Sequence, residues 1–146
     1  EGFHLTTEIY SIDLPDTISH PEHPHEARGK MVYHLPRVHL LQGDGLDLSL
    51  EIVQKLSPHQ RMFFYIDGDH AYNSVKRELV TIMERVPSAD ILVHDTFFIE
   101  ESSWYNSWNN TGPYRAIEDA LKEKPNRYTA MRTETGLPGM TLLYHL

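Results

Sequence analysis

The sequence predicts an α/β fold whose sheet is mostly parallel and ends in a C-terminal antiparallel hairpin. Short runs of β-forming apolar residues alternate with segments in which apolar residues recur at helical spacing. This alternation is the pattern of strands and helices in an open parallel sheet. At 146 residues the chain has the length of one domain. We therefore expect a single domain over residues 1–146.

The stretch 63–72 is the clearest strand-to-helix unit. Residues 63–66 are four consecutive apolar residues, too few for a helix, and they predict a buried strand. Two carboxylates and an imidazole follow, with Gly68 permitting a tight turn. The segment after them repeats apolar residues at intervals of four, three and four, which predicts an amphipathic helix capped by Asn73 or Ser74. The apolar stripe comprises Val75, Leu79, Ile82 and Val86.

The other elements follow from the same patterns. Further strands are predicted at 8–13, 37–42, 89–93, 127–132 and 140–144, the last two forming the hairpin. Further helices are predicted within 26–35, over 46–56, and from Gly112 with Tyr114, Ile117 and Leu121 facing inward.

Composition narrows the function classes. The net charge of −8 argues against a general binder of nucleic acid or of anionic membranes, because phosphate binding needs a basic face. The chain has no cysteine, so disulfides and thiolate metal sites are excluded. No apolar run reaches membrane-spanning length and no signal-peptide pattern is present. We expect a cytoplasmic protein with a small-molecule partner, and possible homo-oligomers.

Acidic residues follow several of the predicted strands. Ligands bind at the carboxyl ends of strands in open α/β sheets, so these positions are candidates for chemistry. Asp13 either binds the ribose hydroxyls of a nucleotide or caps the next turn. The histidine cluster at 20–25 either binds a metal or, the interpretation we favour, belongs to a solvated loop or lid. The acids and imidazoles concerned are Asp13, Asp44, Asp67, Asp69, His70, His94 and Asp95, and the cluster is His20, His23 and His25.

Two segments together resemble a known family. Tyr65-Ile66-Asp67-Gly68-Asp69-His70-Ala71-Tyr72 and Leu92-Val93-His94-Asp95-Thr96-Phe97 look like the fourth- and fifth-strand motifs of the metal-dependent branch of the class I S-adenosylmethionine-dependent O-methyltransferases. The similarity is closest to the cephalosporin-hydroxylase-type proteins and the antibiotic sugar O-methyltransferases. The segment 136–141 also looks like that branch. The resemblance covers residues 8–146 and implies a Rossmann-like methyltransferase sheet.

The resemblance implies roles for individual residues. Asp67 matches the family's first ligand of a divalent cation, Mg²⁺ or Mn²⁺, and His94 and Asp95 match the two ligands after the fifth strand. His94 departs from the usual acid, and an imidazole shifts the metal preference away from Mg²⁺. Asp13 matches the ribose-binding acid and Asp44 the acid near the adenine, and Asp67 also belongs to the cofactor-binding set.

One part of the family pattern is absent from the sequence. The family binds its cofactor with a strand and a glycine-rich loop that precede the strand at 8–13, and only seven residues precede that strand here. We expect the family's first strand, which is central in its sheet, to be missing. The expected explanation is that the chain is the C-terminal part of a longer protein, the alternative being that another segment fills the gap.

The implied reaction is methyl transfer to a hydroxyl of a sugar or phenolic natural product. A bound cation would lower the pKa of the acceptor hydroxyl. Asp69 or His70, beside Asp67, could then take the proton. Alternatively, His70 caps the following helix or bonds a carbonyl, and Asp69 only anchors the turn.

Three aromatic residues, Trp104, Tyr105 and Trp108, follow the strand at 89–93. They are predicted to wall the acceptor pocket. Packing of the loop or a subunit contact would use the same residue types.

Two other function classes stay open. A metal-dependent hydrolase could use the same Asp and His cluster, and it would bind metal without S-adenosylmethionine. A non-catalytic module acting in dimerisation would bind neither. An NAD-dependent dehydrogenase is disfavoured because no G-x-G-x-x-G pattern occurs.

Overall fold

The computed structural model describes residues 7–15, 29–57, 60–97, 112–133 and 139–146. The chain divides into two compact units, residues 1–57 and 58–146, each with its own parallel strand pair. The second unit also contains the antiparallel hairpin. The predicted α/β class, with parallel strands and a C-terminal hairpin, is confirmed. The expectation of one domain over 1–146 stays a prediction.

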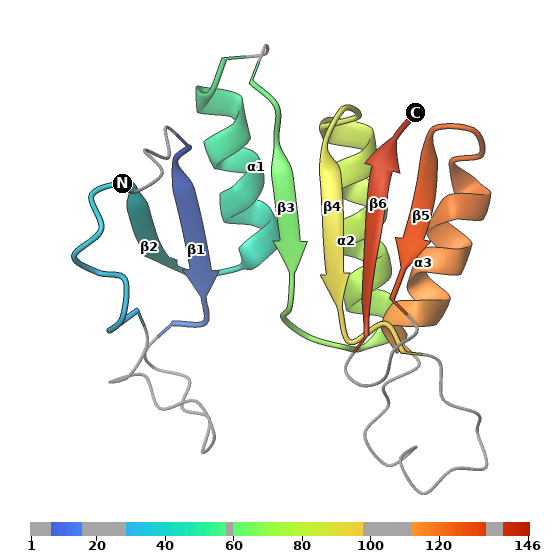
Figure 1. Ribbon diagram of the computed structural model, residues 1–146, viewed down its shortest axis with the longest axis horizontal. Coiled ribbons are helices and arrows are strands. Elements are labelled where there is room, and N and C mark those ends of the chain that lie inside the picture. The colour runs from blue at the N-terminus through green and yellow to red at the C-terminus, as the bar shows by residue number, and fades with distance from the viewer. Residues whose placement is uncertain (1–6, 16–28, 58–59, 98–111, 134–138) are drawn as a thin grey trace, which may run out of the picture. The chain divides into compact units, whose positions relative to one another are not determined.

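The first unit contains a two-stranded parallel sheet and one helix (Figure 1). β1 (Ile9–Asp13) pairs with β2 (Val38–Gln42), so Asp13 lies opposite Gln42 at the carboxyl ends. α1 (Gly45–Lys55) follows directly, with Asp44 as its N-cap. The helix predicted within 26–35 is wrong over its described part, because residues 29–34 form a turn. Gly29, at φ 66°, begins that turn and accepts hydrogen bonds from Val32 and Tyr33.

The second unit contains a four-stranded sheet in the order β3-β4-β6-β5. β3 (Phe63–Ile66) pairs parallel with β4 (Asp90–His94), and β6 (Met140–His145) pairs antiparallel with both β4 and β5 (Tyr128–Arg132). β1 and β3 belong to different sheets and do not pair with each other.

The helices α2 (Tyr72–Arg85) and α3 (Gly112–Glu123) cover one face of this sheet, behind it in Figure 1. The predicted stripe of α2 is confirmed, since Val75, Leu79, Ile82 and Val86 are all buried. On α3, Ile117 is buried as predicted, whereas Ala116 and Ala120 rather than Tyr114 and Leu121 complete the buried face. α3 also packs against α2.

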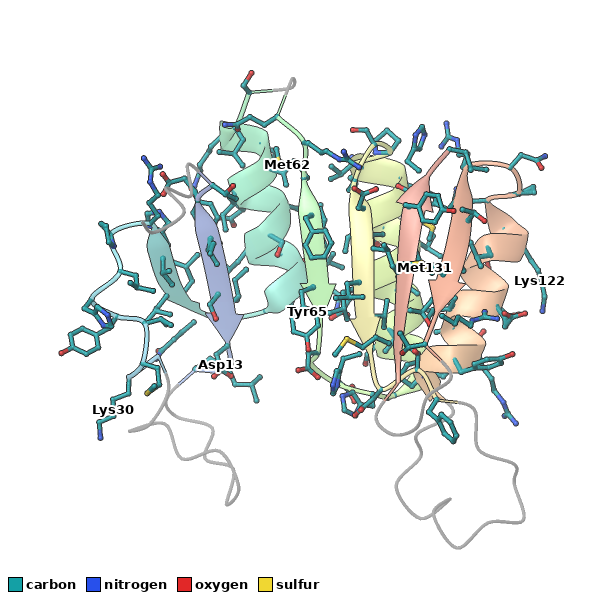
Figure 2. The ribbon with its side chains drawn as sticks, viewed as in Figure 1. Asp13, Lys30, Met62, Tyr65, Lys122 and Met131 are labelled. Atoms are coloured by element: carbon teal, nitrogen blue, oxygen red, sulfur yellow. The ribbon has the colours of Figure 1, made fainter. Side chains whose placement is uncertain are left out.

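The predicted buried strand at 63–66 is only half correct. Ile66 is 9% exposed, but Phe63 is 60% and Tyr65 53% exposed. Side chains alternate between the two faces of a strand, so only one of the two sets can lie under the helices. Phe63 and Tyr65 therefore lie on the face away from the helices. Figure 2 labels Tyr65 near the carboxyl end of β3.

The start of α2 also differs from the prediction. Asn73 and Ser74 lie inside the helix, and the N-cap is Ala71, which has no capping side chain. Asp69 takes over this task, because its two carboxylate oxygens accept hydrogen bonds from the Ala71 amide (3.0 Å) and the Ser74 hydroxyl (2.6 Å). The carboxylate thus fixes the turn through a local side-chain-to-backbone bond. None of the helices in the described part of the chain is long and apolar enough to cross a membrane.

Candidate active site

The site lies where β3 and β4 end. Ile66 of β3 stands opposite Val93 of β4, so the residues that follow each strand emerge side by side. Asp67 follows β3, His94 is the last residue of β4, and Asp95 comes directly after it. The carboxyl ends of parallel strands are where α/β proteins bind ligands. The structure therefore brings together the two acidic strand ends that the sequence singled out.

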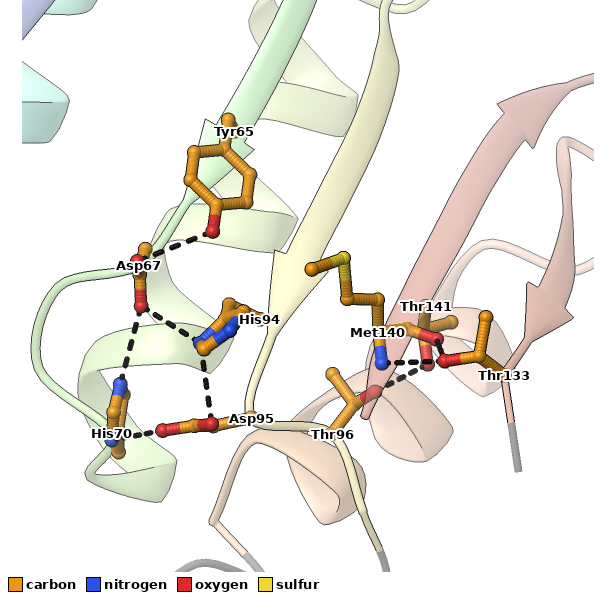
Figure 3. Close-up of polar contacts among 9 residues, drawn as sticks. All are labelled: Tyr65, Asp67, His70, His94, Asp95, Thr96, Thr133, Met140 and Thr141. Carbon is orange, nitrogen blue, oxygen red and sulfur yellow. Dashed lines mark hydrogen bonds and ion pairs between the residues drawn. The ribbon is translucent and has the colours of Figure 1, made fainter. Parts of the chain in front are cut away.

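Two carboxylates and two imidazoles alternate in a closed ring at this edge (Figure 3). The Nδ1 atom of His94 lies 3.0 Å from Asp67 Oδ1 and 3.2 Å from Asp95 Oδ1. On the other side, His70 Nδ1 lies 3.1 Å from Asp95 Oδ2, and its Nε2 lies 3.8 Å from Asp67 Oδ1. Each imidazole is thus shared between the same two carboxylates. We refer to Asp67, His70, His94 and Asp95 as the Asp–His ring.

Polar atoms of the ring remain without hydrogen bonds. His94 Nδ1 and His70 Nε2 are both buried, yet neither makes a hydrogen bond of good geometry with any described residue. Buried polar atoms normally have a partner, and exceptions often mark a site that binds an ion or a ligand. With neutral imidazoles, the ring carries the two negative charges of its carboxylates. It therefore suits a cation or protons.

Asp95 has an unusual backbone conformation. Its φ of 54° lies in the left-handed region, which non-glycine residues seldom adopt and aspartate tolerates better than most. Conformations of this kind concentrate at functional sites, where the surrounding structure maintains them. Here the conformation turns the chain sharply after β4 and presents the carboxylate to His70.

Tyr65 is a site residue that the sequence analysis did not single out. Its hydroxyl donates a hydrogen bond of 3.2 Å to Asp67 Oδ2. Partial burial, together with the neighbouring Asp67 carboxylate, raises the pKa of the Tyr65 phenol. The phenol therefore stays protonated and continues to donate. A tyrosine two residues before a strand-end aspartate is the only signal in the sequence, and it fits an ordinary strand residue equally well.

The two predicted proton acceptors differ in their surroundings. Asp69 is committed to the turn, and the hydrogen bonds from Ser74 and Ala71 lower the pKa of its carboxyl. Among the described residues, His70 neither caps α2 nor bonds a carbonyl, but faces Asp95 and Asp67. Of the pair, only His70 belongs to the Asp–His ring.

One comparison with known proteins decides the family. Residues 7–138 match the family described as rhamnosyl O-methyltransferase/CmcI. The chain belongs to this O-methyltransferase family. It is therefore an enzyme of the methyltransferase class that transfers a methyl group to a hydroxyl. No individual curated protein matches it significantly.

The chemistry of the methyltransferase's ring suits a divalent cation in part. Two carboxylates and an imidazole are ligands for Mn²⁺ and similar ions. The two distances from His94 Nδ1 to the carboxylate oxygens of Asp67 and Asp95 are close to the distance between neighbouring octahedral ligands, about 3.0 Å for bonds of about 2.1 Å. In the described ranges, however, no three such side chains are arranged to hold an ion. Binding one therefore requires these side chains to turn.

Two of the three predicted cofactor residues of the methyltransferase, Asp13 and Asp44, lie in the first unit, and the third, Asp67, lies in the second. Asp13 ends β1, and its Oδ1 accepts a hydrogen bond of 2.7 Å from the Leu14 amide. Asp44 ends the loop after β2 and accepts 2.9 Å from the Asp47 amide as the N-cap of α1. Both acids thus stabilise local turns, as the alternative for Asp13 stated. Neither contact tests a role in cofactor binding.

Several predicted residues lie outside the part of the chain that the structure describes. They are the aromatic residues Trp104, Tyr105 and Trp108 and the histidines His20, His23 and His25.

Proposed function

We propose that this methyltransferase transfers a methyl group from S-adenosylmethionine to a hydroxyl of a small molecule, a sugar or a phenolic natural product, with the help of a divalent cation. The observation that carries the proposal is the Asp–His ring at the carboxyl ends of β3 and β4, in a chain of an O-methyltransferase family. The family description names a rhamnosyl O-methyltransferase, which favours a sugar hydroxyl among the possible acceptors.

His70 is the proposed general base. Its Nδ1 faces Asp95 Oδ2 at 3.1 Å, a distance at which an Nδ1–H donates to the carboxylate. That tautomer leaves a lone pair on Nε2, which lies 3.8 Å from Asp67 and makes no hydrogen bond with a described residue. That lone pair is the atom that would take the proton of the acceptor hydroxyl. Asp95 thus orients the base, and Asp69 supports the turn that carries it.

Asp67, His94 and Asp95 are the proposed ligands of a divalent cation, Mn²⁺ or Mg²⁺. When bound, the ion would lower the pKa of the acceptor hydroxyl. The presence of an imidazole in the set favours Mn²⁺ over Mg²⁺. Tyr65 holds Asp67 from the side through its hydroxyl, and so limits the directions in which this carboxylate can turn.

The remaining assignments rest on the family resemblance. Asp13 is proposed to bind the ribose and Asp44 the adenine part of S-adenosylmethionine, with Asp67 also in the cofactor set. Trp104, Tyr105 and Trp108 are proposed to wall the acceptor pocket. Aromatic residues stack on the apolar faces of sugar and phenol rings, which fits the proposed acceptors.

The test is methyl transfer from labelled S-adenosylmethionine to a panel of sugars and phenols, with added Mn²⁺ or with a chelator. Loss of a general base or of its orienting group costs about 10²–10⁴-fold in rate. We expect losses of that size for His70→Gln and Asp95→Asn. The matched control is Glu84→Gln, which removes an exposed carboxylate of α2 that pairs with Lys124. Full activity of His70→Gln would contradict the assignment of the base.

Binding measurements separate this proposal from the two other function classes. Family membership already favours methyl transfer over hydrolysis. A methyltransferase should show heat of binding with S-adenosylmethionine and a higher melting temperature in its presence. A hydrolase should bind Mn²⁺ alone, and a purely dimerising module should bind neither.

A further inference from the structure

Two buried threonine hydroxyls lie next to the Asp–His ring, where the chain continues from Asp95 and where β6 begins (Figure 3). Thr96 follows Asp95 and is 5% exposed, and Thr141 on β6 is 0% exposed. The Thr141 hydroxyl donates a hydrogen bond of 2.8 Å to the Thr96 hydroxyl (Figure 3). Among the polar and charged residues that the structure describes, only these two are buried. A valine would fill either position equally well, so packing alone does not explain two hydroxyls that satisfy each other.

The pair joins β6 to the turn that carries Asp95. The backbone makes the same connection, because the Thr96 amide donates to the Gly139 carbonyl at 3.4 Å. Thr96 is therefore attached to the start of β6 at two points, one through its backbone and one through its side chain. Asp95, one residue earlier, has the left-handed φ of 54° and faces both imidazoles of the ring.

The start of β6 is itself fixed from the other side. Thr133, just after β5, accepts a hydrogen bond of 2.9 Å from the Met140 amide through its hydroxyl. Its own amide donates to the Met140 carbonyl at 3.0 Å. These bonds close the base of the hairpin and give Thr141 a defined position from which to contact Thr96.

We propose that Thr141 is a positioning residue for the methyltransferase site: through Thr96 it holds Asp95 in the orientation in which its carboxylate meets His70 and His94. The catalytic role of Thr141 rests on the proposed function, whereas its effect on the orientation of Asp95 does not. It also gives a role to the segment Gly139-Met140-Thr141, part of the stretch by which the sequence resembled the family.

Histidine side-chain NMR of the full chain tests this without cofactor or metal. The imidazole signals of His70 and His94 are assigned by their absence from the His70→Gln and His94→Gln variants. Thr141→Val should move both signals, because Asp95 turns away from the rings, and Thr141→Ser should restore them. The matched control is Thr129→Val, a half-buried threonine on the adjacent strand β5.

The double variant Thr96→Val/Thr141→Val separates positioning from stability. It removes both hydroxyls, so no buried hydroxyl of the pair lacks a hydrogen-bond partner. Its melting temperature should therefore stay nearer to wild type than that of Thr141→Val, which leaves the Thr96 hydroxyl alone. We expect it to move the His70 and His94 signals nevertheless. If Thr141→Val and the double variant moved these signals no more than Thr129→Val does, Thr141 would be an ordinary core residue and the inference would be wrong.

A Mn²⁺ titration links the result to function. Residues that orient metal ligands typically change metal affinity about 10–100-fold. We expect Thr141→Val to weaken Mn²⁺ binding at least about 10-fold, and Thr141→Ser to leave it near the wild-type value. If the wild-type chain bound no Mn²⁺, the metal part of the proposed function would fail, whereas the NMR comparison would still decide the positioning role.

Discussion

Replacing Gly139 with alanine should destabilise the second unit and disturb its site. Gly139 has a φ of 72°, in the left-handed region that side chains disfavour. An added Cβ would lie 2.9 Å from the Phe97 amide nitrogen and 3.1 Å from the Phe97 Cβ. Real Cβ atoms do not approach backbone this closely, so the backbone two residues after Asp95 must shift.

The expected cost has two parts. A non-glycine residue in the left-handed conformation costs about 1–2 kcal/mol. Overpacking that moves neighbouring backbone adds about 1–3 kcal/mol. We therefore expect Gly139→Ala to lower the free energy of unfolding by about 2–5 kcal/mol. The matched control is Gly45→Ala, because a Cβ there would meet nothing within 4 Å.

Urea unfolding followed by circular dichroism measures this difference. The Gly139→Ala midpoint should fall well below the wild-type midpoint, and the Gly45→Ala midpoint should match or exceed it, since alanine is the better helix former. Equal midpoints for the two variants would show that the approach of Gly139 to Phe97 carries no strain.

Two further predictions concern the helix layer. Leu79→Ala removes a side chain that is 0% exposed between α2 and the sheet, and it should cost about 2–5 kcal/mol in urea unfolding; a cost below about 1 kcal/mol would contradict the observed packing. Hydrogen bonds from Lys122 and Tyr72 lower the pKa of Asp119 in the folded protein. Its carboxylate therefore stabilises the fold at any pH above the unfolded-state pKa of about 3.9. This stabilisation is lost as the pH falls through the lower folded-state pKa. Asp119→Asn should therefore flatten the dependence of the urea midpoint on pH below about pH 4, and an unchanged acid profile would rule out this contribution.

The elements that could be predicted best from the sequence are those that a local pattern of apolar, acidic or turn-forming residues specifies by itself. The stripe Val75, Leu79, Ile82 and Val86 has helical period and lies under the sheet as expected. The acids at the ends of β3 and β4 could be paired from sequence, because parallel strands bring their carboxyl ends to one edge. The hairpin followed from two β-rich runs separated by a glycine- and proline-containing segment.

The errors arise where packing or one particular hydrogen bond, rather than local composition, decides the outcome. The run at 63–66 is apolar throughout, but Ile66 is buried whereas Phe63 and Tyr65 are exposed, which composition does not reveal. The Asp69 carboxylate outcompetes Asn73 and Ser74 at the start of α2 by reaching two residues forward. The Thr96–Thr141 pair spans 45 positions, so no local pattern announces it.

The central claim is that Asp67 and Asp95 converge on one cation-binding site together with His94. A calorimetric titration with Mn²⁺ tests it most directly, in the wild-type chain, in Asp67→Ala and in Asp69→Ala, which removes a neighbouring carboxylate that serves the turn. We expect Asp67→Ala to abolish the heat of binding and Asp69→Ala to retain it. Undiminished Mn²⁺ affinity in Asp67→Ala would contradict the claim.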